Sequence, residues 1–368
     1  MPDKEEDDAD KEKRMGSMGL VFRPVATFTS SGSEASDAIS SIDFSPDGSH
    51  FATGGLARKI RLYSFTGNQP AGDMASGSRK RTCPAESAAG LQKLDEIYTP
   101  AKLSSLAWCP SDRSVISCGD YDGVVTDWDA ECGVAVVERY DHGGRRVWSV
   151  DYSRAEHHPG LCASASADGT VRLWTARTDT SVAVMRPSSA GASVCSAQFS
   201  PFRPNLLTAA SADGSFSLFD IRNTEECVTS SRGHARAVSY VRFVDEARVV
   251  SASIDNSVKV WDMELRLERK WEGQHLNVKN FVGLSVLESR GGLIACGSET
   301  NQVFVYHRGD EKSLWRSARL PSADDDAGAF VGAVCWRRVD GGHCDDVHSL
   351  LAANSDGSLH LIHARVLG

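Results

Sequence analysis

One short pattern recurs seven times along the chain: an apolar strand ends in an aromatic or apolar residue and a turn follows. The clearest copies are 170–174 (TVRLW) and 257–262 (SVKVWD). The strand ends of all seven copies are Tyr63, Trp128, Trp174, Phe219, Trp261, Tyr306 and Ile362. They follow one another at intervals of 65, 46, 45, 42, 45 and 56 residues. A period in the low forties with a Trp-Asp ending is typical of four-stranded propeller blades. The sequence therefore predicts an all-β protein, a seven-bladed WD40 β-propeller.

The size and charge of the chain agree with this fold and exclude several classes of function. Seven blades of about 40 to 45 residues account for nearly all of the 368 residues. A net charge of −9 argues against general affinity for nucleic acid or anionic membranes. No apolar run is long enough for a spanning helix, and the charged start of the chain lacks the apolar core of a signal peptide. The ten cysteines are scattered through strand patterns, which indicates reduced thiols. We expect a protein of the nucleus and cytoplasm.

The two ends of the chain predict how the ring closes. Residues 1–18 are dense in charge and are predicted to be disordered, so that the propeller domain covers 19–368. The chain ends on LHLIH (359–363), which matches the third strand of a blade. Residues 19–29 read as a strand and can supply the missing outer strand. Such closure removes the open edges of an array of blades.

Two insertions interrupt the period. Residues 66–97 are rich in Gly, Ser, Ala and Pro and are predicted to form a surface loop. This loop contains the basic run 79–81, which indicates either a nuclear-import signal or a merely solvated loop. Residues 322–329 are predicted to form an acidic loop in the last blade.

A repeat protein provides its own control, because positions that only support the blade should look alike in every copy. Before the first apolar residue of the first strand, neighbouring blades two and three carry the cations Lys102 and Arg146. After that apolar residue, six blades have a small or medium side chain and blade three has Trp148. Before the turn Asp, only blade two has an aromatic residue, Tyr121. Departures from the repeat point to function.

These departures are expected to meet in space. The start of the first strand and the turn between strands two and three lie on one rim of a propeller. Arg236 and Lys279 precede the first strands of other blades and add cations to this rim. Aromatic and arginine side chains carry much of the energy of protein interfaces, and cations suit acidic partners. The rim is predicted to bind an extended peptide with an apolar anchor and acidic neighbours; the alternative is that Trp148 only fills the channel and the cations are ordinary solvated charges.

No motif predicts catalysis, a cofactor or a metal. The chain has no Gly-x-Gly-x-x-Gly, no P-loop and no Gly-x-Ser-x-Gly. The histidine-containing stretch 343–348 matches no zinc spacing and is interpreted as a polar hairpin loop. His142 and His234 precede first strands, where we expect structural hydrogen bonds within the blade, for His234 with Asp255 and Trp261. The chain is predicted not to be an enzyme.

A further motif, Phe-Asp-Ile-Arg at 219–222, resembles the WD-x-R box of propellers that dock on the DDB adaptor of cullin-4 ubiquitin ligases. The resemblance implies adaptor docking through Asp220 and Arg222. The alternative is a local Asp–Arg ion pair, and the sequence does not decide between them.

Longer motifs are more specific than the generic repeat. They are KLSSLAW (102–108), DYDGVVTDWD (120–129), RVWSVDYS (146–153), GHARAVSYVRF (233–243), KNFVGL (279–284) and ACGSETN (295–301). From about residue 37 to the C-terminus, the chain closely resembles the propellers of the plant constitutive-photomorphogenic ubiquitin ligase and its SPA partners. Only a few dozen residues precede the propeller, so the chain is most similar to the short members, the repressors of UV-B photomorphogenesis (RUP).

The resemblance implies a non-enzymatic adaptor and negative regulator of UV-B light signalling. Such a protein binds the C-terminal Val-Pro motif of the UV-B photoreceptor and promotes its return to the inactive dimer. The residues that carry over to the peptide groove are Lys102, Tyr121, Arg146, Trp148, Arg236 and Phe281. Tyr121 and Trp148 would hold the Val-Pro between them, and the cations would face acidic flanks.

The photoreceptor core, the photomorphogenic/SPA ligase and the cullin-4/DDB adaptor are further partners that the resemblance implies. Where the family has a lysine, this chain has Ala235-Arg236-Ala237, so that Arg236 departs from the pattern. An alternative function is a substrate receptor of a cullin-4 ligase that targets a transcription factor.

Overall fold

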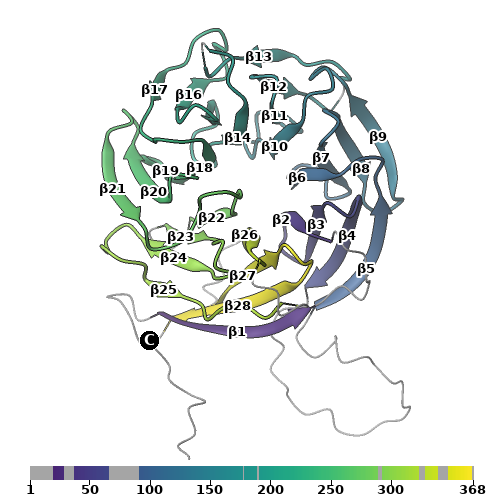
Figure 1. Ribbon diagram of the computed structural model, residues 1–368. Helices are drawn as coiled ribbons and strands as arrows, with labels where there is room; N and C mark the ends of the chain where they lie inside the picture. The colour runs from purple at the N-terminus through teal and green to yellow at the C-terminus, as the bar shows by residue number, and fades with distance from the viewer. Residues whose placement is uncertain are drawn as a thin grey trace, which may run out of the picture.

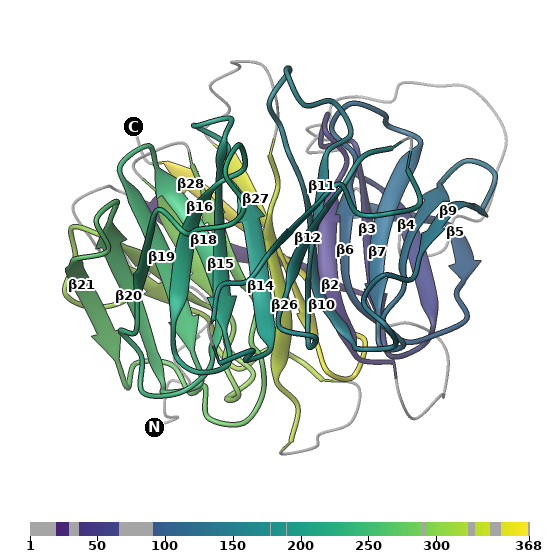
Figure 2. The same ribbon diagram turned by 90° about the horizontal axis from the view of Figure 1, so that it is seen from above.

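The chain forms a closed ring of seven four-stranded antiparallel sheets around a central opening (Figure 1). The computed structural model describes residues 20–28, 37–65, 91–176, 178–188, 190–288, 292–322, 328–338 and 347–366. Seen from above, the blades stand side by side and their strands run from one face of the ring to the other (Figure 2). The predicted seven-bladed β-propeller is confirmed. Within the described residues, no helix is long and apolar enough to cross a membrane.

Each blade contributes four strands, numbered outward from the central channel except in the last blade. Blade 1 contains β2 (Ile39–Phe44), β3 (His50–Gly55), β4 (Lys59–Phe65) and β5 (Leu91–Tyr98). Blade 2 contains β6 (Leu103–Trp108), β7 (Val115–Asp120), β8 (Val125–Asp129) and β9 (Val134–Arg139). Blade 3 contains β10 (Val147–Tyr152), β11 (Cys162–Ser166), β12 (Val171–Trp174) and β13 (Ala183–Met185). Blade 4 contains β14 (Val194–Phe199), β15 (Leu206–Ser211), β16 (Phe216–Asp220) and β17 (Thr229–Ser231).

The remaining blades follow the same plan. Blade 5 contains β18 (Val238–Asp245), β19 (Arg248–Ser253), β20 (Ser257–Asp262) and β21 (Leu267–Glu272). Blade 6 contains β22 (Leu284–Leu287), β23 (Leu293–Cys296), β24 (Phe304–His307) and β25 (Trp315–Arg316). Blade 7 contains β26 (Val331–Trp336), β27 (Val347–Asn354), β28 (Leu359–Val366) and β1 (Leu20–Phe28).

The N-terminal strand closes the ring, as predicted. Strand β1 pairs antiparallel with β28, from Leu20 opposite Val366 to Phe28 opposite Leu359. The register shifts next to Pro24. A proline has no N–H for the ladder, so it is tolerated here because β1 is the outer strand of its sheet.

Small residues allow neighbouring blades to pack closely. At Gly119 in β7, a Cβ atom would lie 2.4 Å from the Cγ1 atom of Val147 in the next blade, so only glycine fits. Asp-Gly pairs form the tight turn between the second and third strands of several blades. Gly123, for example, adopts a φ of 87°, which residues other than glycine rarely reach. Gly119 therefore allows two blades to pack closely, and Gly123 allows a tight turn within blade 2.

The predicted C-terminal end of the loop over 66–97 is wrong, because residues 91–97 belong to strand β5. The side chains of Leu91 and Ile97 are buried, and β5 pairs with β4 along its whole length. The residues between Leu91 and Ile97 are mostly polar, so the sequence of this segment lacks a clear strand pattern. Residues 1–18 and 66–90, residues 323–327 of the expected acidic loop and residues 343–346 of the expected hairpin loop lie outside the described residues.

The expected structural role of His234 is confirmed. Its Nδ1 atom lies 2.9 Å from Asp255 Oδ2 and its Nε2 atom lies 2.7 Å from Ser251 Oγ. Trp261 Nε1 donates to the same Ser251 hydroxyl at 2.8 Å. The burial of His234 lowers its pKa, and the hydrogen bond from His234 helps to keep the pKa of Asp255 below its usual range.

Blade 3 contains the same series of hydrogen bonds from Asp through His and Ser to Trp. His142 Nδ1 lies 2.8 Å from Asp168 Oδ2, and its Nε2 atom shares the Ser164 hydroxyl with Trp174 Nε1. Both histidines therefore connect strands within their blade, which is the role that the sequence predicts for them.

Candidate peptide-binding site

The turn between strands two and three and the start of the first strand lie on the same rim. In blade 2 the backbone N–H of Tyr121 donates to the carbonyl of Lys102 at 3.0 Å. In blade 3 the N–H of Ala167 donates to the carbonyl of Arg146 at 2.8 Å. These hydrogen bonds bring the turn and strand positions that depart from the repeat onto one face, as predicted.

Arg146 is the centre of a cluster of aromatic side chains on this rim. The carbon of its guanidinium lies 3.2 Å from the ring centre of Tyr121 and 4.3 Å from that of Trp148. Such contacts attract the cation to the negative face of each ring. Burial lowers the pKa of Arg146. The two rings that the family resemblance assigns to a Val-Pro anchor are therefore covered by the protein's own guanidinium.

Trp148 reaches across the mouth of the central channel. Its indole Nε1 donates to the Ser193 hydroxyl of the next blade at 3.1 Å. Its ring centre lies 5.2 Å from that of Phe281, at an interplanar angle of 47°. Trp148 stands in blade 3 and Phe281 precedes the first strand of blade 6. The ring thus spans the channel mouth and also forms one wall of the aromatic cluster.

Phe281 differs from its expected place in the blade. First strands of the repeat follow an apolar-x-x-apolar-x-apolar pattern, which Phe281, Leu284 and Val286 match, so the sequence predicts Phe281 as the first core residue of its strand. In the structure, β22 begins at Leu284 and Val282 is the fully buried residue. At Gly283 a Cβ atom would lie 2.5 Å from the backbone N of Val334, so the chain packs directly on blade 7 there. This local departure leaves Phe281 half-buried and facing Trp148.

The segment before Phe281 is held by Glu299, which the comparison of repeats did not single out. One oxygen of its carboxylate accepts hydrogen bonds from the three consecutive N–H groups of residues 278–280, at 3.0, 2.6 and 2.7 Å. Arg236 donates to the first carbonyl of this segment at 3.0 Å and to that of Ile254 at 3.1 Å. Arg236 therefore lies on the rim and positions the Phe281 segment, while its side chain remains exposed.

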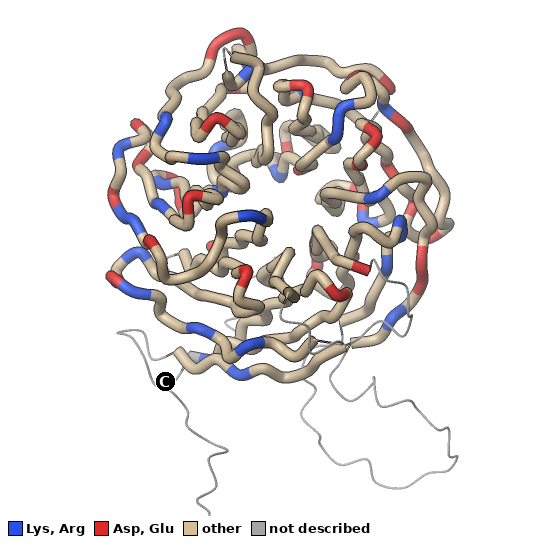
Figure 3. The backbone as a smooth tube through the Cα atoms, viewed as in Figure 1, with Lys and Arg blue, Asp and Glu red and all other residues tan. Residues whose placement is uncertain are grey.

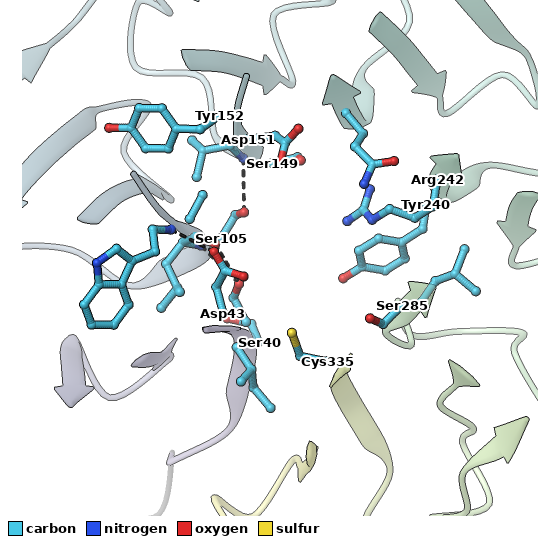
Figure 4. Close-up of a pocket in the computed structure, with 18 of the residues that line it drawn as sticks. Ser40, Asp43, Ser105, Ser149, Asp151, Tyr152, Tyr240, Arg242, Ser285 and Cys335 are labelled. Atoms are coloured by element: carbon cyan, nitrogen blue, oxygen red, sulfur yellow. Dashed lines mark hydrogen bonds between the residues drawn. The ribbon is translucent and has the colours of Figure 1, made fainter. Parts of the chain in front are cut away.

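A polar cavity of about 110 Å³ lies in the channel and is lined in part by Trp148. Figure 4 shows Asp43 and Asp151 on one side and Arg242 with Tyr240 on the other. Burial raises the pKa of each of the two carboxyl groups to about 6. Desolvation is the cause, because burial disfavours the charged form.

The cavity residues also connect neighbouring blades. Asp43 accepts a hydrogen bond from the backbone N–H of Trp108 in the next blade, and Asp151 accepts one from Phe199, both at 2.8 Å. Sequence reasoning missed this ring, although the sequence carries a signal four residues after the first apolar residue of each first strand. That position reads Asp43, Ala107, Asp151, Gln198, Arg242, Ser285 and Cys335.

Asp220 and Arg222 form a local ion pair at the end of β16. Arg222 Nη2 lies 2.5 Å from Asp220 Oδ2, and the Arg222 side chain is 71% exposed. This is the ion pair that the sequence offered as the alternative. Docking of a ligase adaptor through these residues stays a prediction.

The charges of the ring are mixed. Figure 3 shows Lys and Arg interspersed with Asp and Glu around its circumference. In the part of the chain that the structure describes, no three His, Cys, Asp or Glu side chains are placed to hold a metal ion. The rim combines aromatic rings with an arginine, which are side chains that often carry the binding energy of protein interfaces.

Comparisons with known families agree with a WD-repeat propeller. Residues 22–64 match the family described as WD domain, G-beta repeat. Residues 144–310 match the N-terminal domain of nucleolar protein 10-like proteins.

The chain is also similar to individual plant proteins. It is 40% identical to the WD repeat-containing protein RUP1 of Arabidopsis thaliana over 92% of this chain and 83% of that protein. It is 41% identical to RUP2 of the same plant over 89% of this chain and 88% of that protein. The E3 ubiquitin-protein ligase COP1 is 34% identical over 89% of this chain, but the match covers only 45% of COP1.

Proposed function

The chain belongs to the RUP family of plant WD-repeat proteins, which act in photomorphogenesis, and on this premise we propose that it switches off UV-B signalling by binding the UV-B photoreceptor. It would act as a non-enzymatic adaptor in the nucleus and cytoplasm and would read an acidic Val-Pro segment of the photoreceptor's C-terminal tail. One observation carries this proposal: Tyr121, Arg146, Trp148 and Phe281 meet at the channel mouth.

Each part of the peptide has a counterpart on the rim. The aromatic rings suit a Val-Pro anchor, because a proline is already restricted and loses little entropy when it binds. Lys102 and Arg146 lie beside these rings and suit acidic residues next to the anchor. Arg236 stands over the segment that presents Phe281, so it contributes mainly by positioning that segment.

Arg146 couples the two parts of the motif. Its guanidinium covers Tyr121 and Trp148, so an apolar anchor reaches the ring faces only after the guanidinium moves. A carboxylate beside the anchor stabilises the displaced guanidinium through a charge-assisted hydrogen bond. A peptide with both features therefore binds better than one that has only the anchor.

Return of the photoreceptor to its dimer requires more than capture of its tail. A protein promotes one arrangement of its partner only through contacts that favour that arrangement. We therefore propose a second contact with the photoreceptor core, while the rim holds the tail close to it and raises the local concentration.

A second candidate function is a substrate receptor of a cullin-4 ligase. It rests on the exposure of the Arg222 side chain, which is 71% exposed although its guanidinium is paired with Asp220. In this case the rim would hold a transcription factor with the same type of acidic motif.

Calorimetric titration with an acidic Val-Pro peptide tests the first proposal. We expect the unmodified protein to bind the peptide with a dissociation constant in the micromolar range or lower. Trp148→Ala should bind it at least about tenfold more weakly, which is a loss of about 1.4 kcal/mol in binding free energy. Tyr98→Ala is a matched control, since Tyr98 is an exposed aromatic residue on β5. Absence of binding, or equal binding by Trp148→Ala, would overturn the assignment of the groove. A rate of photoreceptor dimer recovery that the protein does not change would overturn the signalling role.

A further inference from the structure

The eleven large hydrophobic side chains that are exposed within the described residues fall into two groups. Nine of them lie on an outer strand or directly beside one, at the circumference of the ring. The other two, Leu276 and Val278, lie between β21 and β22, in the segment that leads to Phe281. Exposed apolar residues are ordinary when they are scattered over a surface. These two stand together beside the candidate peptide-binding site, so they need a separate explanation.

The segment that contains these two residues is fixed, although it belongs to no strand. Five consecutive backbone N–H groups in it donate to side-chain oxygens. The N–H of Leu276 donates to Ser298 Oγ at 3.0 Å. The N–H of Asn277 donates to Asn256 Oδ1 at 2.9 Å. The N–H groups of the next three residues all donate to Glu299 Oε1. A backbone that is held in this way before binding loses little entropy when a ligand packs on it.

Two carbonyl groups of the segment are held as well. The carbonyl of Leu276 accepts a hydrogen bond from the backbone N–H of Glu299 at 2.8 Å. The carbonyl of Val278 accepts one from the guanidinium of Arg236 at 3.0 Å. Asn277, which lies between them in the chain, is completely buried. The segment therefore turns Asn277 inward and presents Leu276 and Val278 to solvent as a fixed apolar pair.

Two cations stand next to the apolar pair. Arg236 holds the carbonyl of Val278, and Lys279 follows Val278 in the chain. Both cationic side chains are exposed. Apolar side chains that are bordered by cations suit an apolar residue with acidic neighbours. The groove at Trp148 has the same combination of apolar and cationic side chains, so one acidic peptide fits both surfaces.

Phe281 connects the apolar pair to the groove. Its ring centre lies 5.2 Å from that of Trp148. Val278 is three residues from Phe281 in the chain, so their Cα atoms are at most about 11 Å apart. The Cα atom of Leu276 is at most about 18 Å from that of Phe281. An extended peptide covers these distances with about three and five residues. A peptide whose anchor lies at Trp148 and Phe281 therefore reaches the apolar pair within about five residues of its anchor.

The size of the apolar pair indicates what covers it. A specific interface between folded proteins buries about 800 Å² on each partner, and two side chains offer far less. The pair therefore suits a peptide that is already held in the groove. We propose that Leu276 and Val278 form a second subsite of the groove, which takes an apolar side chain of the acidic peptide two to five residues from its Val-Pro anchor. This subsite rests on the proposed function and adds a further residue to the motif that the rim reads.

Calorimetric titration of the full chain with a series of peptides tests the subsite. The parent peptide has Val-Pro with an acidic residue on each side, and serine at the second to fifth positions before and after the anchor. Each further peptide replaces one of these serines by leucine. We expect leucine at one or more positions to strengthen binding about threefold to tenfold, because its side chain leaves water when it packs on the apolar pair. Val278→Ser should remove this gain and leave the affinity for the parent peptide unchanged.

Val228→Ser is the matched control, because Val228 is an exposed valine beside β17 at the circumference, and this variant should keep the gain from leucine. Binding of the parent peptide with no gain from any leucine would overturn the subsite alone. So would a gain that Val278→Ser and Leu276→Ser both retain, or a Val278→Ser variant that weakens the parent peptide as much as the leucine peptide. A parent peptide that does not bind would overturn the proposed function, and the subsite with it.

Discussion

The ring centre of Trp148 lies 5.2 Å from that of Phe281, so blade 3 and blade 6 touch across the mouth of the channel. Two blades separate them along the chain. The contact depends on two local departures from the repeat: a large side chain at position 148 and a chain that leaves its strand position before Leu284. The candidate site is thus assembled from parts of the ring that are distant in sequence.

Replacement of Arg146 should change affinity in opposite directions for two peptides. With Arg146→Gln, the ring faces are no longer covered by a cation, so a neutral Val-Pro peptide should bind several-fold tighter. An acidic Val-Pro peptide should bind about tenfold weaker, because it loses its charge partner. Calorimetry with the two peptides measures both effects. Arg145→Gln has the same charge change one residue away, and it should leave the ratio of the two affinities unchanged.

Removal of one hydroxyl should weaken blade 5. Ser251→Ala leaves Trp261 Nε1 and His234 Nε2 without their shared buried partner, which should lower the free energy of unfolding by about 2 kcal/mol. Urea unfolding measures the change, with Ser230→Ala on the exposed strand β17 as the control. A loss as small as that of the control would mean that the network contributes little to stability.

The buried carboxyl of Asp43 should make stability depend on pH. Its pKa in the folded protein is about 6, above the ordinary value of 3.8, so the folded state binds more protons than the unfolded state between these values. This group therefore favours unfolding more strongly as the pH rises from about 4 to 6. Asp43→Asn keeps an acceptor for the Trp108 N–H and removes the charge. The variant should gain up to about 3 kcal/mol over the unmodified protein at pH 8, and the gain should be smaller at pH 5 in thermal or urea unfolding. A gain that is the same at both pH values would contradict this account.

The buried ion pair of Arg139 and Asp127 should show strong coupling. Their side chains are 1% and 6% exposed, so Arg139→Met leaves a buried carboxylate without its cation and should cost about 3 kcal/mol. The double variant Arg139→Met, Asp127→Leu should recover part of this loss, since no buried charge remains. Denaturant unfolding of the two single variants and the double variant measures the coupling, and strictly additive losses would argue against it.

Replacement of Arg222 separates the two candidate functions. As a substrate receptor, the protein should lose capture of a cullin-4 adaptor in Arg222→Glu, while its peptide affinity at the channel mouth should stay unchanged. Stability should change by less than about 1 kcal/mol, because the ion pair with Asp220 is exposed. Co-purification with the adaptor and titration with the peptide are the two measurements. A weaker peptide affinity in this variant would show that the two surfaces are not independent.

Much of the fold could be predicted because it depends on local, repeated patterns. The strand ends at Trp174 and Trp261, the Asp-Gly turns and the N-terminal strand each follow from sequence near themselves. Strand β5 was missed because Lys93, Asp95 and Glu96 interrupt its apolar pattern, and only pairing with β4 makes this segment a strand. For the rim, the comparison of repeats selected Tyr121, Arg146 and Trp148, since they differ from their counterparts in other blades.

The sequence by itself determined the number of blades, the closure of the ring and the side chains that depart from the repeat, because hydrophobic period and turn chemistry are local properties. Only the tertiary structure decided that Arg146 covers the two rings, that Phe281 turns toward Trp148 and that Asp43 and Arg242 line opposite sides of one cavity in the channel. Closing the ring sets these contacts, since it brings together side chains from blades that are far apart in the chain.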